Sequence, residues 1–332
     1  MATNKLPVDE VFEEYIKVEG VMTNPMYGKD PNQRDIQELI HSGVINLDKP
    51  ANPTSHEVAA WVRNLLRVSK TGHGGTLDPQ VTGCLPITLG KSTKAVQVLL
   101  PAGKEYIAIG VLHGDVDPEK LKSVAEQFVG KIYQMPPVRS AVKRKLRTRT
   151  IYYIEMLEIF ERHYLFRVGC QAGTYIRKLC YDIGMACGVG GHMKELRRTR
   201  SGPFNEDTAV TLHDLNDAIH YYYEEKNPDY LRKIIQPIEN AMRHIPYLVV
   251  RDSAVDAICH GASLTAPGIV KVSSRISNGR LVIIKSLKGE AIALGTALTN
   301  TKDILTMSHG IIVKTERVLM ETGTYPTSWK KK

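Results

Sequence analysis

One segment of the sequence, residues 72–83, has residue types that suit chemistry. It runs Gly-His-Gly-Gly-Thr-Leu-Asp-Pro-Gln-Val-Thr-Gly, and its glycines allow sharp turns and a close approach of the backbone to a ligand. His73 and Asp78 add an imidazole and a carboxylate, which can transfer protons or attack a substrate. An Asp before Pro79 is also typical of a turn or a helix start, so a purely structural Asp78 is the alternative. The segment lacks the Gly-Lys-Ser/Thr ending of a Walker phosphate loop.

Basic residues are concentrated in two further segments. The chain carries 44 Lys and Arg against 35 Asp and Glu, a formal net charge of +9. Such clusters bind phosphate groups, and the binding weakens as salt rises. The charge therefore favours a polyanionic partner such as a nucleic acid. Residues 194–200 contain four basic residues and one acid, and residues 139–149 contain six basic residues and no acid: Arg139, Lys143, Arg144, Lys145, Arg147 and Arg149.

The composition argues against membrane-spanning, secreted and metal-dependent classes. The 332 residues include no run of about 18 apolar positions, and residues 1–10 lack an apolar signal-peptide core. The five cysteines form no Cys-x-x-Cys pair, which favours reduced thiols over a disulfide framework or a zinc site. We therefore expect a cytoplasmic protein with no metal site. A glycine run at 187–191 follows an expected helix instead of a strand, which argues against a dinucleotide-binding fold.

Interleaved helices and strands must position these residues. Apolar periodicity alternates between helical and strand-like spacing along the first 246 residues. Hairpin-like pairs of strands are frequent, which favours an α+β fold with a mainly antiparallel, mixed sheet over a doubly wound α/β fold. The expected elements are a helix that follows a capping box at 54–57, a helix from Pro118 that Gly130 ends, a helix from Thr174 that Gly188 ends, and strands at 106–113 and 164–170.

The composition changes near Pro246, which marks a second domain. Residues 247–325 are short apolar runs separated by Gly, Pro, Ser and Asn, typical of a small β-rich unit that can fold alone. One short helix is expected within it, at 252–260. Residues 1–40 are polar and contain Asn-Pro and Asp-Pro breakers. The chain is therefore divided into an N-terminal extension at 1–40, a main domain at 41–246, the β-rich domain at 247–325 and a short basic tail at 326–332.

Several motifs resemble those of the TruB family of pseudouridine synthases, and they occur in the family's order. The likeness covers about residues 40–325 and is greatest to the archaeal catalytic subunit of the H/ACA ribonucleoprotein, a relative of dyskerin. It implies a pseudouridine synthase fold for the main domain, which would then be catalytic. The motifs are Leu47-Asp48-Lys49-Pro50 with Thr54-Ser55, the segment 72–83, Lys104-Glu105-Tyr106, Gly173-Thr174-Tyr175-Ile176-Arg177, and residues 194–204.

The resemblance implies a role for each residue of the site. Pseudouridine formation breaks the N-glycosidic bond, turns the uracil and rejoins it through carbon, so the base must first flip out of its helix. The resemblance makes Asp78 the essential carboxylate, acting as nucleophile or as base on the ribose. It gives Arg177 the ion pair with that carboxylate and places the Tyr106 ring against the uracil. Because the isomerisation is redox-neutral, no cofactor is expected. Substrate-binding roles are implied for His73, Tyr175 and Leu196.

The resemblance also implies how RNA and partners bind. The basic stretch 139–149 matches a thumb-like loop that closes over substrate RNA. The β-rich domain resembles a PUA pseudobarrel, on which the N-terminal extension would pack and which anchors the guide RNA in guide-dependent relatives. Asp256, His260, Gly261 and Ala262 are the residues expected at that contact. The implied partners are an H/ACA guide RNA, substrate rRNA or tRNA, a small zinc-ribbon protein, a small β-barrel protein and a kink-turn-binding protein.

Three functional alternatives stay open at this level. The protein is the catalytic subunit of a guide-dependent ribonucleoprotein, a stand-alone enzyme acting on the T-loop of tRNA, or a catalytically silent RNA-binding scaffold. Intact Asp78, Tyr106 and Arg177 argue against the scaffold. The N-terminal extension, the complete β-rich domain and the variant Gly74-Gly75-Thr76 favour the first alternative. The target uridines, the guide sequences and the activity without partners do not follow from the sequence.

Overall fold

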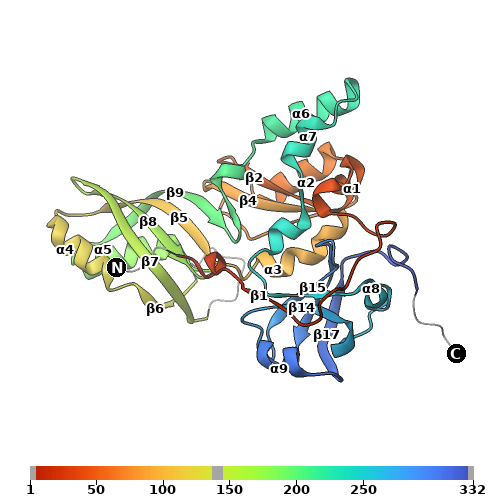
Figure 1. Cartoon of the computed structure of the whole chain (residues 1–332). Coiled ribbons are helices and arrows are strands. Elements are labelled where there is room, and N and C mark those ends of the chain that lie inside the picture. Colours follow the sequence, from red (N-terminus) through yellow and green to blue (C-terminus); the bar gives the residue numbers. More distant parts are fainter. Residues whose placement is uncertain (1–4, 137–144, 328–332) are drawn as a thin grey trace.

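The computed structural model describes residues 5–136 and 145–327, which form two β-sheets with helices packed on them (Figure 1). The larger sheet belongs to the main domain. The smaller one is formed by the C-terminal residues together with one N-terminal strand, so the expected α+β class with mainly antiparallel pairing is confirmed. Within the described ranges, no helix is long and apolar enough to cross a membrane.

The larger sheet joins strands from both ends of the main domain. Its β4–β9 pair is parallel, whereas the other neighbours pair in antiparallel fashion. Among the described residues its path is β11 (Gln236–Pro237), β2 (Gly43–Lys49), β4 (Thr82–Leu89), β9 (Gly191–Ser201), β5 (Lys104–Leu112), β8 (His163–Cys170), β7 (Arg147–Phe160) and β6 (Gly130–Gln134), with β3 (Thr71–His73) beside β4 and β10 (Phe204–Asn205) beside β9.

Two hydrophobic cores support the two halves of this sheet. Helices α1 (Ile36–Ser42), α2 (Ser55–Leu65), α6 (Leu212–Glu224) and α7 (Asp229–Ile234) enclose one core with β2 and β4. Helices α4 (Pro118–Glu126) and α5 (Ile176–Ala186) enclose the other with β5, β7 and β8. The parallel β4–β9 pair lies at the junction of the halves. Loops from both halves therefore meet at this junction.

The short helices η3 (Gly90–Ala95) and α3 (Val96–Leu99) follow β4, and η4 (Glu206–Thr208) and η5 (Ile238–Met242) lie later in the domain.

Most of the expected elements are confirmed, and one boundary is wrong. The capping box starts α2: the Thr54 hydroxyl accepts from the Glu57 N–H at 3.1 Å, and the Glu57 carboxylate accepts from the Thr54 N–H at 2.7 Å. α5 ends at Ala186, and Gly188 follows with φ +86°. α4, however, stops at Glu126 and not at Gly130. Three i to i−3 hydrogen bonds tighten the chain over 127–129 first, and Gly130 instead begins β6.

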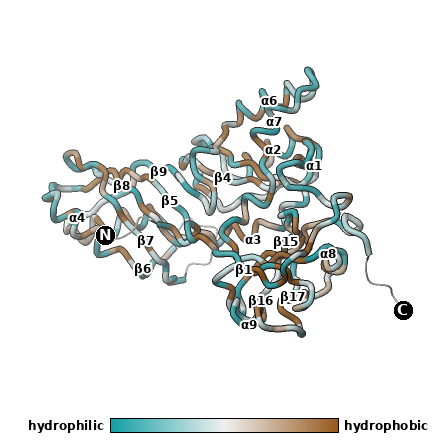
Figure 2. The backbone as a smooth tube through the Cα atoms, viewed as in Figure 1, coloured by the Kyte–Doolittle hydropathy of each residue, from teal (hydrophilic) through white to brown (hydrophobic). Residues whose placement is uncertain are grey.

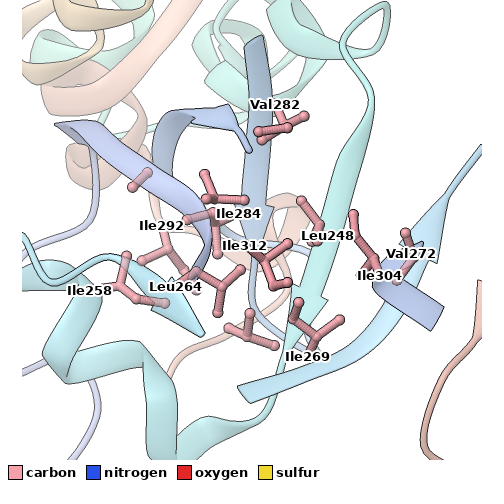
Figure 3. Close-up of a cluster of buried hydrophobic side chains, with 14 of the residues drawn as sticks. Leu248, Ile258, Leu264, Ile269, Val272, Val282, Ile284, Ile292, Ile304 and Ile312 are labelled. Atoms are coloured by element: carbon pink, nitrogen blue, oxygen red, sulfur yellow. The ribbon is translucent and has the colours of Figure 1, made fainter. Parts of the chain in front are cut away.

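The C-terminal domain is a curved sheet closed around its own apolar core. Its strands are β12 (Tyr247–Val250), β13 (Leu264–Thr265), β14 (Ile269–Ser273), β15 (Leu281–Lys285), β16 (Ala291–Ala297) and β17 (Ile311–Val318). Helices α8 (Asp252–Cys259), α9 (Thr301–Thr306) and the turn η6 (Ala266–Gly268) cover its ends. Isoleucine and valine side chains fill the interior (Figure 3), and Figure 2 shows hydrophobic residues gathered along β15–β17.

The N-terminal segment ties the two domains together. After the turn η1 (Pro7–Asp9), Asp9 pairs with Arg200 of β9. Strand β1 (Glu14–Ile16) then pairs with β14 of the C-terminal domain. The Lys17 ammonium donates to the carbonyls of Ile304 and Met307, each at 2.6 Å. The segment passes a second turn, η2 (Pro31–Gln33), before it enters α1. It therefore crosses from the main sheet to the C-terminal sheet and back (Figure 1).

Candidate active site

A cavity of about 530 Å³ opens at the junction of β4 and β9, where the loop 75–81 faces the start of α5. The β4–β9 pairing brings the sequence motifs together although they are far apart along the chain. Its walls are Gly75, Thr76, Leu77, Asp78, Val81, Leu100, Lys104, Tyr106, Ala172, Gly173, Thr174, Tyr175, Ile176, Arg177, Met193, Leu196 and Arg198.

Asp78 and Arg177 form an ion pair at the mouth of this cavity. A guanidinium nitrogen, Nη2, donates to Oδ2 of the carboxylate. Both side chains are about half-exposed, with 47% for Arg177 and 56% for Asp78, so each stays accessible to a ligand. The Val81 N–H donates to the Asp78 carbonyl at 3.0 Å, and Asp78 therefore precedes a turn and not a helix. The paired guanidinium fixes the direction of the carboxylate.

A buried lysine holds the loop that carries Asp78. Lys49, at the end of β2, is fully buried. Its ammonium donates to the carbonyls of Pro50, Pro79 and Val81 at 2.7, 2.9 and 2.9 Å. Burial lowers the pKa of Lys49, while three carbonyl acceptors use all three donors of its charged form. The backbone on the C-terminal side of Asp78 is therefore fastened to β2.

Arg198 fastens the other side of the same loop. It is only 1% exposed, and it donates to the Cys84 carbonyl from Nε at 2.7 Å and to the Gly75 carbonyl from Nη2 at 3.0 Å. Gly83 pairs with Arg198 across the parallel ladder. A Cβ on Gly83 would lie 2.2 Å from the Arg198 carbonyl, and its φ is +104°. This position therefore requires glycine.

Tyr106 lies half-buried on β5 and contacts this guanidinium. Burial raises the pKa of Tyr106, whereas the nearby Arg198 charge and its hydrogen bond to the hydroxyl act in the opposite direction. The Tyr106 ring forms part of the cavity wall. Lys104, two residues earlier, is 4% exposed and donates to the carbonyls of Leu99, Leu100 and Ala102 at 2.8, 3.1 and 2.8 Å. Burial lowers the pKa of Lys104 to about 7.

Two of the three residues expected to contact the substrate line the cavity, and the third does not. Tyr175 and Leu196 line the cavity. The Tyr175 backbone is fixed by Gln134, which accepts from its N–H at 2.9 Å and donates to its carbonyl at 3.1 Å. His73 is not among the lining residues; it ends β3 and packs edge-on against the His56 ring, with centroids 4.9 Å apart. Burial lowers the pKa of His73 to about 4, so its imidazole is neutral at pH 7.

The basic stretch lies partly outside the described residues. Arg139, Lys143 and Arg144 belong to that undescribed part. Lys145 precedes β7, and Arg147 and Arg149 lie on β7 itself, so the strand starts inside the basic cluster. The Arg149 guanidinium reaches the cavity wall, because a Cβ on Gly173 would lie 3.2 Å from its Nε.

The C-terminal candidates lie at the end of α8 and divide into exposed and buried residues. His260, Gly261 and Ala262 are exposed, and Gly261 has φ +90° with open space where a side chain would point. Asp256 is buried, with 1% exposure. Its carboxylate accepts from the Thr327 hydroxyl at 2.9 Å and from the Gly323 N–H at 3.4 Å. The Asp256 side chain therefore holds the C-terminal segment and is not presented at the surface.

Sequence reasoning did not assign roles to Lys49, Lys104 and Arg198. All three fall inside motifs that the sequence analysis did identify. The sequence could have indicated them, because each is a lysine or arginine at a position where strand alternation predicts burial. A buried cation needs several hydrogen-bond acceptors and therefore organises the segments around it.

Comparison with known proteins decides the family. A probable tRNA pseudouridine synthase B of Methanopyrus kandleri is 59% identical over 98% of this chain and 96% of its own length. The homonymous protein of Pyrococcus abyssi is 54% identical over 98% and 97%. This chain belongs to the TruB family of pseudouridylate synthases. It is thus an RNA pseudouridine synthase, and the TruB resemblance of its sequence motifs is confirmed.

Family models divide the TruB chain along its length. The TruB family N-terminal domain matches residues 63–176, and the tRNA pseudouridylate synthase B C-terminal domain matches 177–243. A PUA domain matches 246–319, and a DKCLD domain matches 3–59. The expected C-terminal PUA domain is therefore confirmed.

Two solved structures resemble the whole chain. One is a Cbf5-Nop10-Gar1 complex, with TM-score 0.94 and 53% identity over 97% of this chain and 98% of that one. The other is an H/ACA ribonucleoprotein bound to a substrate RNA containing 2′-deoxyuridine, with TM-score 0.94 and 51% identity over 98% and 100%. This TruB chain therefore has the fold of the Cbf5 type.

Proposed function

We propose that this chain isomerises uridine to pseudouridine in guide-paired rRNA as the catalytic subunit of an H/ACA-type ribonucleoprotein. The observation that carries the proposal is the Asp78–Arg177 ion pair at the mouth of a cavity lined by Tyr106, Tyr175 and Leu196. The likeness to the chain in an H/ACA ribonucleoprotein with substrate RNA supports the guide-dependent form. The division at residues 41–246 and 247–325 is part of the proposal.

The geometry suits a flipped-out uridine. The Tyr106 ring offers a flat surface on which the base stacks, and Tyr175 and Leu196 border the same space. Asp78 then faces the ribose, where its carboxylate attacks C1′ or takes a proton from C2′. Breaking the C1′–N1 bond leaves its electron pair on N1 of the uracil. The turned base forms the C5–C1′ bond and afterwards loses its C5 proton, while N1 gains one. Arg177 keeps Asp78 oriented throughout.

RNA is held at two further places in this proposal. The basic residues of 139–149 bind phosphates of the substrate strand, and replacing Lys143, Arg144 and Lys145 with alanine should raise the dissociation constant and flatten its dependence on salt. His260, Gly261 and Ala262 form the guide contact of the PUA domain, because Gly261 leaves open space for a close approach of RNA to the backbone. Asp256 supports this contact from beneath, since its carbonyl bonds the His260 ring at 2.8 Å.

The proposed partners follow from the resembling complexes. The Cbf5 chain in one solved structure is bound to Nop10 and Gar1. We propose that this chain likewise binds a small zinc-ribbon protein, a small β-barrel protein, a kink-turn-binding protein and a guide RNA.

A stand-alone enzyme acting on the tRNA T-loop is the second candidate. The observation that favours it is the name of the relatives from Methanopyrus kandleri and Pyrococcus abyssi, tRNA pseudouridine synthase B. Both candidates use the same cavity and differ only in how the uridine is selected. A silent scaffold is the third, and it would need neither Asp78 nor Arg177.

Tritium release from RNA labelled at uracil C5 separates the candidates. Wild type and Asp78→Ala are each tested on bare tRNA and on a guide-paired substrate with the partner proteins. Release by wild type and none by Asp78→Ala supports the enzyme and the role of Asp78. Release that requires the guide supports the ribonucleoprotein subunit, and release from bare tRNA alone supports the second candidate. RNA binding without release under any condition supports the scaffold.

A further inference from the structure

Two buried cations line the cavity together with Tyr106, and we call this pair the floor. Arg198 comes from β9 and Lys104 from β5, and both line the cavity while staying 1% and 4% exposed. They converge under the catalytic loop. A Cβ on Gly75 would lie 3.7 Å from Arg198 Nη1, and 3.7 and 4.0 Å from Cε and Nζ of Lys104. The floor therefore brings the Arg198 guanidinium and the Lys104 amine, whose pKa is lowered to about 7, within reach of whatever occupies the cavity.

No carboxylate in the described parts of the chain neutralises these charges. Across residues 5–136 and 145–327, neither Arg198 nor Lys104 takes part in a salt bridge. Glu105, the acidic residue next to Lys104 in sequence, instead accepts from the hydroxyls of Tyr153 and Thr199. A buried charge without a counter-ion is costly. Backbone carbonyls satisfy the hydrogen bonds of both cations, but dipoles offset the charge only in part.

The reaction supplies the missing negative charge. When the C1′–N1 bond breaks heterolytically, its electron pair moves onto N1 and spreads to O2 and O4 of the departing uracil. We propose that Arg198 and Lys104 stabilise this uracil anion while it turns from N1 to C5. This inference rests on the proposed function and adds two residues to it.

The floor suits a base that must rotate. Preorganised charge in a water-poor site stabilises a developing anion without reorganising solvent. Charges on the cavity wall act on the anion in either orientation of the base, whereas a hydrogen bond to one edge would break during the turn. Neither cation gives a proton to the uracil anion, because its electron pair returns to carbon as C5 bonds to C1′. The C5 proton then leaves to solvent or to a base. An anion in the cavity also favours the charged form of Lys104.

The test compares two leaving groups. Fluorine at C5 makes uracil a stronger acid, so its anion needs less stabilisation by the protein. Lys104→Met and Arg198→Gln are measured in single turnover on RNA with uridine or 5-fluorouridine at the target, as consumption of the target nucleoside. On uridine each variant should lose about 10²-fold in rate. On 5-fluorouridine the loss should be smaller by about tenfold, and Lys104→Arg should recover most of the uridine rate.

Lys49→Met is the matched control. Lys49 is also a buried cation that donates to three carbonyls, but it is not among the residues that line the cavity. Any loss in this variant should be equal for the two bases. Thermal unfolding of each variant shows whether the chain is folded at the assay temperature, and a temperature at which all are folded is used.

The outcomes separate this inference from the proposed function. If Lys104→Met and Arg198→Gln lose equal rates on both bases, or keep rates like those of wild type, the proposed role of these two residues is rejected. The proposed function of the enzyme is unaffected by that result. If wild type consumes neither base on guide-paired RNA or on bare tRNA, the proposed function is rejected. The role of Arg198 and Lys104, which rests on it, is then rejected too.

Discussion

Arg177 donates to the carboxylate of Asp78 across 99 positions of sequence. Asp78 stands in a loop that Lys49 and Arg198 fasten on its two sides, and Arg177 stands in the first turn of α5. The two segments belong to different halves of the sheet and meet only because β4 pairs with β9. The ion pair is therefore a property of the tertiary fold.

The charge on Arg177 should matter more for the rate than for binding. Arg177→Met removes the partner that orients Asp78, so we expect kcat to fall by about 10²–10³-fold with little change in KM. Arg177→Lys should recover part of the loss, because a lysine keeps the charge but not the planar geometry. Steady-state tritium release measures both constants. A large rise in KM with unchanged kcat would instead make Arg177 an RNA-binding residue.

The buried Lys49 ammonium should contribute strongly to stability. Lys49→Met leaves the carbonyls of Pro50, Pro79 and Val81 without this donor, and we expect the free energy of unfolding to fall by roughly 3 kcal/mol. Lys94 is the control, because it is exposed and donates to one carbonyl, that of Val318; Lys94→Met should cost less than about 1 kcal/mol. Urea unfolding measures both, and equal effects would contradict the role given to Lys49.

Glycine at position 83 should be irreplaceable. In Gly83→Ala the added Cβ lies 2.2 Å from the Arg198 carbonyl, so the β4–β9 ladder must open and the catalytic loop must move. We expect loss of activity together with a lower melting temperature. Gly188→Ala is matched, since its φ is also positive, +86°, but the added Cβ meets nothing within 4 Å. That variant should cost only about 1 kcal/mol and keep its activity. Activity retained in Gly83→Ala would show that the ladder tolerates a side chain there.

Acid should destabilise the fold through His244. This ring bonds the Val98 carbonyl at 3.0 Å through Nε2, and burial lowers the pKa of His244 to about 4. The unfolded chain takes up a proton at a higher pH than the folded one, so stability is complete above about pH 6.5 and is lost as pH falls towards 4. The difference amounts to roughly 3 kcal/mol at most.

His244→Gln provides the comparison for this pH dependence. Glutamine can still donate to Val98 but does not titrate. The difference in unfolding free energy between pH 7 and pH 4 should therefore shrink in this variant. The pH dependence that remains should include a contribution from His73, because burial also lowers the pKa of His73 to about 4. An identical pH profile for wild type and His244→Gln would exclude His244 as a cause.

The sequence by itself determined the class, the family and the local elements. The Thr54–Glu57 capping box and the helix stop at Gly188 depend on contacts within a few residues, so local patterns suffice to predict them. The end of α4 was misplaced because three tightened turns after Glu126 leave no distinct pattern. Motif order identified Asp78, Tyr106 and Arg177 as a set.

Only the tertiary structure decided how these residues are supported and which candidates face the cavity. Asp256 lies in the amphipathic helix α8, just before the exposed candidates His260, Gly261 and Ala262, yet it is buried because the C-terminal segment folds over it. Lys49 and Arg198 are buried where segments far away in sequence supply carbonyl acceptors. The acceptors of Lys104 are instead local, since Leu99, Leu100 and Ala102 lie just before β5. Strand alternation can mark such a position as buried, but sequence spacing does not show which distant carbonyls accept from Lys49 and Arg198.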